Sequence, residues 1–254
     1  MHQSLPAGIL ASPRLGSPEK SYTRASHSYV EKARPVGDPK VLRRPGRLVT
    51  MTIRAVCKRC NEGWMSGLEQ RVRPVLEPLV RGQECILDRA AQTMLAEWVA
   101  LKVMVIEQAS PQDVVLTKED RHALMTEGRI PDGVLILIGQ TRPAVWWTAA
   151  MERHVAMMSG NAGGALPKGA RGKNVATIAL GLGALLVYVL VCRAPGLALD
   201  AAVRVDPRLP RLWPASGGIL WPPPRSLSDA DAHAVASSLR TMIANPVVRW
   251  RPDP

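Results

Sequence analysis

The sequence predicts an α+β protein in which helices pack on an antiparallel sheet. Residues 88–108 repeat apolar side chains at helical spacing, and Thr117 and Asp120 fit a capping box that opens a helix over 118–127. After Gly128 the texture changes to short apolar runs separated by turn residues, which is typical of strands. We expect these strands at 133–139, 144–148 and 153–158. The 254 residues suffice for one sizeable domain or two small ones.

The most informative stretch is 56–69, where Cys57 and Cys60 form a C-x-x-C pair. Two thiolates at this spacing can bind one metal ion from a tight turn, with Zn–S bonds of about 2.3 Å. Asn61 follows directly and is placed to cap a helix. The apolar residues after it recur at helical spacing and predict one apolar face: Trp64, Met65, Leu68 and Val72. The alternatives are a redox pair, which needs a preceding strand and a βαβ context, or two ordinary buried thiols.

The letters CKRCNEGWMSGLE, residues 57–69, resemble the second half of a zinc-knuckle HNH endonuclease domain. More narrowly, they resemble bacterial and phage HNH-like proteins with a C-x-x-C-N-x-G-W-M-x-x-L-E core. Later segments are also similar, so the resemblance covers roughly residues 50–240. It implies a partial ββα-metal unit that acts on DNA by metal-dependent phosphodiester hydrolysis, with Mg²⁺ or Mn²⁺ at the catalytic centre. It also implies a structural zinc ion on Cys57 and Cys60, and Asn61 as a contributor to the catalytic metal site.

The chain departs from this family pattern upstream of Cys57. The family has a first C-x-x-C there, which completes the zinc site, and then an acidic residue followed by the His that activates water. No cysteine precedes Cys57 in this sequence, and neither His2 nor His27 has that acidic neighbour. His154 is the downstream candidate for a replacement ligand or base. A start codon upstream of Met1, or decay of the gene, would each explain a truncated or inactive HNH-like protein.

The positive charge of the chain is concentrated near its beginning. The net charge is +12, and residues 1–60 carry 12 Lys and Arg against 3 Asp and Glu, a net charge of +9. A basic block beside a metal knuckle predicts salt-dependent binding to the phosphate backbone of nucleic acid, here DNA. The alternative is a solvated basic tail. The sequence does not indicate an oligomeric state.

The pattern of cysteines and apolar residues predicts a cytoplasmic protein. Residues 1–30 lack the continuous apolar core of a signal peptide. Four cysteines, of which two are adjacent in a C-x-x-C pair, suit a reducing compartment rather than a disulfide scaffold. We expect Cys85 and Cys192 to be lone buried thiols.

We divide the chain into three segments. Residues 1–46 are basic, rich in Pro, Gly and Ser, and predicted to be disordered. Residues 47–82 hold a strand at 47–55, the partial knuckle and a helix that should end or kink near Arg73, because Pro74 and Pro78 each remove a backbone donor. Residues 83–254 form a family-specific α+β domain that closes with a helix over 228–243, capped by Ser228.

Two features of this last segment concern burial. In the 88–108 helix we expect Trp98 in the core, and Glu97, Lys102 and Glu107 on the solvated side. Residues 175–192 form an uncharged run that is long enough for a membrane span, but their many β-branched residues favour two buried strands around 181–183.

The main function predicted, from the resemblance, is an HNH-type endonuclease-like protein. The alternatives are a non-catalytic nucleic-acid-binding protein, or a single-span membrane protein through 175–192.

Overall fold

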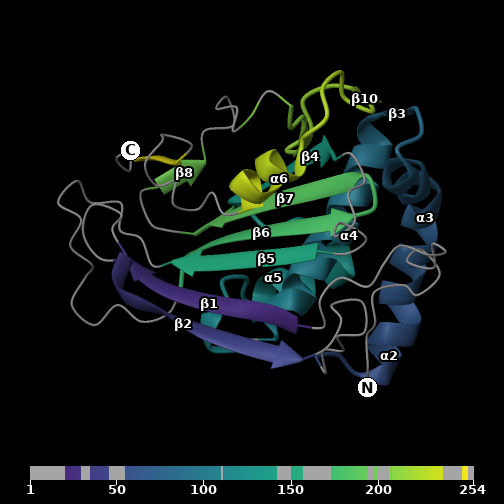
Figure 1. The fold of residues 1–254 in the computed structure, drawn as a ribbon. Helices are drawn as coiled ribbons and strands as arrows, with labels where there is room; N and C mark the ends of the chain where they lie inside the picture. The colour runs from purple at the N-terminus through teal and green to yellow at the C-terminus, as the bar shows by residue number, and fades with distance from the viewer. Residues whose placement is uncertain are drawn as a thin grey trace.

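The structure, a computed structural model, describes residues 55–109, 111–141, 150–156, 173–193, 197–199, 206, 208–236 and 248–250, and the strands at 21–29 and 35–45. As predicted, it is an α+β protein with helices and antiparallel sheets (Figure 1). The described elements do not include a ββα-metal unit. Apart from Ala55, the strand expected at 47–55 lies outside the described residues.

A five-stranded sheet with the order β5-β6-β7-β4-β9 forms the centre of the molecule, and each neighbouring pair is antiparallel. Its strands are β4 (Val134–Gln140), β5 (Ala150–Ala156), β6 (Val175–Leu182), β7 (Leu185–Cys192) and β9 (Arg211–Trp213). His154 lies in β5, opposite Thr177 of β6. The strands expected at 133–139 and 153–158 correspond to β4 and β5, whereas 144–148 lies outside the described residues.

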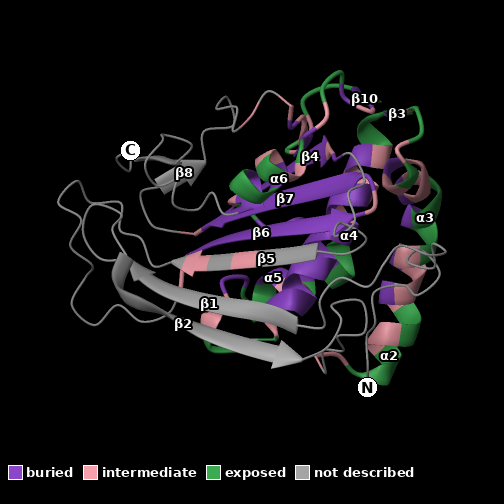
Figure 2. Ribbon diagram, in the orientation of Figure 1, coloured by how far each residue is buried: buried purple, intermediate pink, exposed green. Residues whose placement is uncertain are grey.

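The uncharged 175–192 run forms the hairpin β6–β7, so the membrane-helix alternative is wrong and the two-strand prediction is confirmed. Every residue of both strands is buried, because the sheet is covered on both faces (Figure 2). Helix α4 (Arg89–Glu107) lies on one side, and α6 (Asp229–Ala236) lies over β6 and β7 on the other. Helix α3 (Ser66–Arg81) contacts β7. In the described part of the chain, no helix has the length and apolarity to cross a membrane.

The turn of this hairpin requires a glycine. Gly183 has φ 56°, and a Cβ atom there would lie 2.5 Å from the backbone oxygen of Val80 at the end of α3. A side chain would therefore meet both a strained backbone and a carbonyl oxygen. The same contact carries a hydrogen bond from the Ala184 N–H to the Val80 oxygen at 2.8 Å, which joins the sheet to α3.

Helix α4 (Arg89–Glu107) is the central helix of the core. Asp88 caps it by accepting the N–H of Ala91 at 2.8 Å, and Gln108 ends it, which confirms the predicted bounds. Trp98 is buried, as predicted. The expectation that its charged residues face solvent is wrong: Lys102 is only 4% exposed and Glu107 is 0% exposed. The reason is tertiary, because α3, α5 (Lys118–Glu127) and the sheet surround the second half of α4.

Each buried charge on α4 has a partner from another element. The Lys102 ammonium pairs with the Glu69 carboxylate of α3 and lies 5.6 Å from the centre of the Trp98 ring. The Glu107 carboxylate accepts the N–H groups of Val115 and Leu116, each at 3.1 Å, and an Arg153 N–H at 3.5 Å. Glu97 is half-buried, and burial raises the pKa of its carboxyl. These contacts replace the hydration that the charges lose.

Helix α3 (Ser66–Arg81) continues through Pro74 and Pro78, so it does not end near Arg73, one of the two predicted outcomes there. A proline inside a helix costs about 3 kcal/mol. The apolar face of the helix is buried and consists of Leu68, Val72, Leu76 and Leu79. Each fully buried aliphatic side chain contributes about 1.5–3 kcal/mol, so together the four outweigh the cost of the two prolines. Gly82, with φ 67°, ends the helix.

The remaining elements are short or peripheral. A hairpin of β1 (Ser21–Tyr29) and β2 (Pro35–Pro45) lies within 1–46, the segment expected to be disordered, and β1 runs beside β5 (Figure 1). A backbone ladder needs no apolar periodicity, which is why the sequence pattern missed it. Two further strand pairs are β3 (Cys85–Leu87) with β10 (Ile219–Trp221), and β8 (Leu197–Leu199) with β11 (Val248–Trp250). The capping box predicted for α5 is present, and Gly128 ends that helix.

Replacing Glu107 by Ala should lower the free energy of unfolding by about 3 kcal/mol, because two buried N–H groups and Arg153 lose their acceptor. Chemical denaturation followed by circular dichroism measures this. The control is Glu127→Ala, whose carboxylate pairs with Arg129 on the surface and should change stability by less than about 1 kcal/mol. Equal losses in both variants would contradict the structural role of Glu107.

Candidate metal site

The cysteine pair lies on the first turn of a helical run. Cys57 is the N-cap of α2 (Lys58–Cys60), with φ −75° and ψ 162°, and its Sγ accepts the N–H of Cys60 at 3.4 Å. The chain then passes through a π-helical turn, Asn61–Met65, into α3, with a kink at Gly63. The predicted N-cap role of Asn61 is therefore wrong: Asn61 has helical dihedrals and donates its N–H to the Cys57 oxygen at 3.0 Å.

The two thiols are accessible and close to each other. Cys57 is exposed and Cys60 is half-buried, so the alternative of two ordinary buried thiols does not hold. The Cys60 backbone N–H, followed by the Cys60 thiol, lowers the pKa of Cys57. The hydrogen bond between the two thiols is the largest cause that raises the pKa of Cys60. The arrangement thus favours a thiolate at Cys57, which is the form that binds metal.

The donor set fits half of a structural zinc site. Two thiolates can take two of the four tetrahedral positions around zinc. In the described part of the chain, no three His, Cys, Asp or Glu residues form a group that could hold a metal ion. Cys85, in β3, is half-buried and burial raises its pKa, while Cys192 ends β7 in the core. The amide oxygen of Asn61 is a hard donor of the kind that suits Mg²⁺ or Mn²⁺ rather than zinc.

The structure does not describe the side chains of the predicted histidines, so it places none of them at the cysteine turn. His2 and His27 have no described side chains, and neither has His154. His122 and His233 lie exposed on α5 and α6, as surface helical residues. The prediction that a base serves the cysteine turn therefore stays a prediction.

The turn is fixed to the core by the helix that follows it. Met65 and Leu68 are buried, which confirms the predicted apolar face, and Trp64 packs half-buried against the same core. Glu69 adds the buried ion pair to Lys102 of α4. The thiols thus lie on a helical turn that continues, through the kink at Gly63, into a helix packed on the core.

Exposed cationic side chains lie in the cysteine turn and farther along α3. Lys58 and Arg59 are exposed between the cysteines, and Arg73 is exposed on α3. Lys58 pairs with Glu62 at 3.8 Å, with both side chains more than 60% exposed, so this pair is weak. None of the ion pairs among the described residues includes Arg59 or Arg73. These guanidinium groups can contact phosphate.

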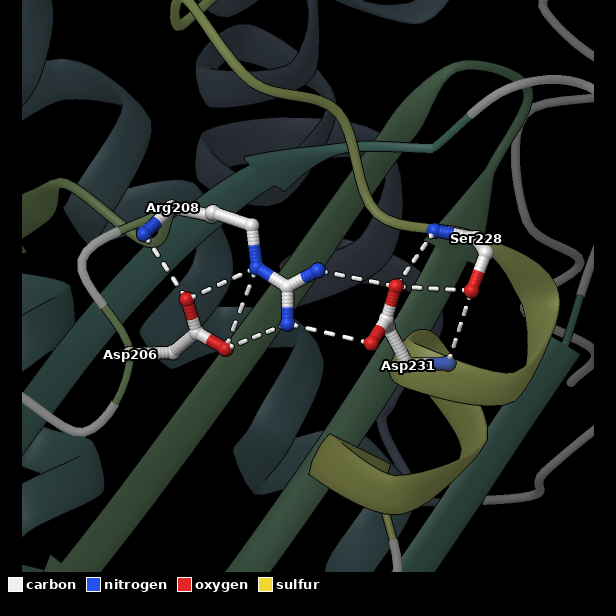
Figure 3. Close-up of polar contacts among 4 residues, drawn as sticks. All are labelled: Asp206, Arg208, Ser228 and Asp231. Carbon is white, nitrogen blue, oxygen red and sulfur yellow. Dashed lines mark hydrogen bonds and ion pairs between the residues drawn. The ribbon is translucent and has the colours of Figure 1, made fainter.

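A second polar cluster lies at the start of α6 (Figure 3). Arg208 lies between Asp206 and Asp231, with guanidinium-to-carboxylate distances of 2.8 Å to each. Asp231 also accepts the Ser228 N–H at 3.0 Å, which completes the cap predicted at Ser228. Arg208 lowers the pKa of both carboxyls. Because the charges satisfy one another, we interpret this cluster as a structural clasp that holds α6 on the sheet.

No protein-family model, curated protein or solved structure matches this chain. The features that bear on its function are therefore the geometry of the cysteine turn and the sequence around it.

The clasp should make part of the stability depend on pH. A carboxyl whose folded pKa is depressed stabilises the fold above its unfolded pKa of about 3.9, and this contribution is lost as the pH falls through the folded pKa. We expect the unfolding free energy of Arg208→Met to fall less steeply than that of the wild type as the pH drops below about 4. The measurement is urea denaturation over a pH series, with exposed Arg225→Met as the control. Parallel curves for wild type and Arg208→Met would contradict the clasp.

Proposed function

We propose that this chain is an HNH-type endonuclease-like protein that binds DNA, in which Cys57 and Cys60 hold a structural zinc ion. The observation that supports the proposal most is the pairing of two accessible thiols on one helical turn, with the Cys57 sulfur accepting the Cys60 N–H at 3.4 Å. The resemblance of residues 57–69 to an HNH zinc knuckle is consistent with this geometry.

Each part of the site has a separate chemical task in this proposal. Zinc on the two thiolates would stabilise the turn and the start of the helical run. The side chain of Asn61, next to Cys60, would help to hold Mg²⁺ or Mn²⁺, and that ion would supply charge stabilisation to a scissile phosphate. Arg59 and Arg73 would contact the phosphate backbone.

A second candidate is a nucleic-acid-binding protein without catalysis. The exposed guanidinium groups of Arg59 and Arg73, which take part in no ion pair among the described residues, favour it. Their charges are free to release counterions from DNA, which makes binding fall steeply with salt. This candidate needs no water-activating base.

The purified wild-type chain should contain zinc, and Cys57→Ser should lower the zinc content because a serine hydroxyl is a much poorer zinc ligand. Elemental analysis by mass spectrometry measures this after gel filtration. The matched control is Cys85→Ser, which removes a lone half-buried thiol and should leave the zinc content unchanged. Zinc absent from the wild type, or unchanged in Cys57→Ser, would count against the proposal.

The two candidates differ in a plasmid assay with Mg²⁺ or Mn²⁺. Cleavage that is lost in Asn61→Ala supports the endonuclease, whereas salt-sensitive retention without cleavage supports the binding protein. In both cases Arg59→Ala with Arg73→Ala should reduce the slope of log affinity against log salt by about 0.9 for each lost phosphate contact. Arg81→Ala is the control, because Arg81 already pairs with Glu77. A protein that shows neither cleavage of the plasmid nor retention on DNA would contradict both candidates.

A further inference from the structure

We propose that Cys57 and Cys60 form a reversible intramolecular disulfide, which makes this turn a redox-sensitive site. The disulfide itself does not depend on the proposed zinc ion. The further statement that oxidation expels zinc rests on the proposed function. In reducing compartments, such disulfides are usually transient, redox-sensing bonds rather than structural links.

The backbone at Cys57 brings the two side chains together. In a regular helix, Cβ atoms three residues apart lie roughly 5–6 Å from each other. A disulfide needs Cβ atoms about 3.8 Å apart. Cys57 has extended dihedrals as the N-cap, so its side chain folds back over the first turn, and its Sγ lies 3.4 Å from the Cys60 nitrogen.

Two further features allow the bond to form. Gly63 interrupts the regular helix with φ −93° and ψ −113°, and no atom lies within 4 Å of the position of a Cβ there. This kink separates the cysteine turn from α3, whose start is anchored by Met65 and Leu68. Cys57 is also the most exposed of the four cysteines, so an oxidant in solvent reaches it first.

The reaction balances with a peroxide as oxidant. The Cys57 sulfur attacks one peroxide oxygen, the O–O bond breaks, and Cys57 becomes a sulfenic acid with release of water. The Cys60 sulfur then attacks the Cys57 sulfur, a second water leaves, and the S–S bond forms. The two thiols lose two electrons in total, which the peroxide gains. A thiol reductant restores both cysteines by disulfide exchange.

Oxidation and metal binding exclude each other at this turn. Zinc binds thiolates, and a disulfide has neither the charge nor the free lone-pair geometry of two thiolates. Each bridge formed should therefore release the zinc ion that the pair held. The turn would lose its zinc under peroxide and regain the capacity to bind it after reduction.

Peptide mapping of the full-length chain tests the bridge directly. Lys58 and Arg59 lie between the cysteines, so trypsin cuts inside the loop, and a bridge would join peptide 55–58 to peptide 60–71. After treatment with hydrogen peroxide and alkylation of free thiols, mass spectrometry should find these peptides linked, and a reductant should separate them. Zinc release is followed in the same sample with a chromogenic chelator.

The variants make each outcome decisive. Cys60→Ser should abolish the linked peptide and leave a sulfenic acid on Cys57 that dimedone traps, whereas Cys85→Ser should form the bridge as wild type does. Bridging without any zinc in the reduced protein supports the disulfide and contradicts only the proposed zinc site. Retained zinc with no linked peptide, or a bridge from Cys57 to Cys85, would overturn the inference.

Discussion

The attachment of α3 to α4 is the interaction on which the cysteine turn depends. The apolar face of α3 lies on α4, and the Glu69–Lys102 ion pair joins the two helices inside the core. Lys102 is 4% exposed, so removal of Glu69 would leave a buried charge without a partner, which is far more costly than loss of a surface pair. The first turn, with Cys57 and Cys60, extends from this fixed helix, and its thiols therefore have a defined orientation.

The sheet also fixes the position of α3, through a contact at the end of that helix. β6 and β7 are buried on both faces, and their turn at Gly183 contacts the Val80 carbonyl at the end of α3. One end of α3 is thus held by the sheet and the body of the helix by α4. The clasp around Arg208 lies at α6, on the opposite face of the sheet, and serves the fold rather than the cysteine turn.

Local sequence patterns predicted the elements whose causes are local. Asp88, the Thr117–Asp120 capping box and Gly128 each set a helix end where expected. The errors arise from contacts distant in sequence. Lys102 and Glu107 are buried because other elements supply their partners, and α3 continues through Pro74 because packing outweighs the lost hydrogen bond. At the site, the C-x-x-C spacing predicted neighbouring thiols, but not that Cys57 rather than Asn61 caps the helix.

X-ray absorption at the zinc edge of the full-length protein identifies the atoms that touch the ion. We expect at least two sulfur neighbours at about 2.3 Å, and the loss of both when Cys57→Ser and Cys60→Ser are combined. A shell of only nitrogen and oxygen at about 2.0–2.2 Å in the wild type, or sulfur neighbours that survive the double substitution, would show that this pair of thiols is not the zinc site.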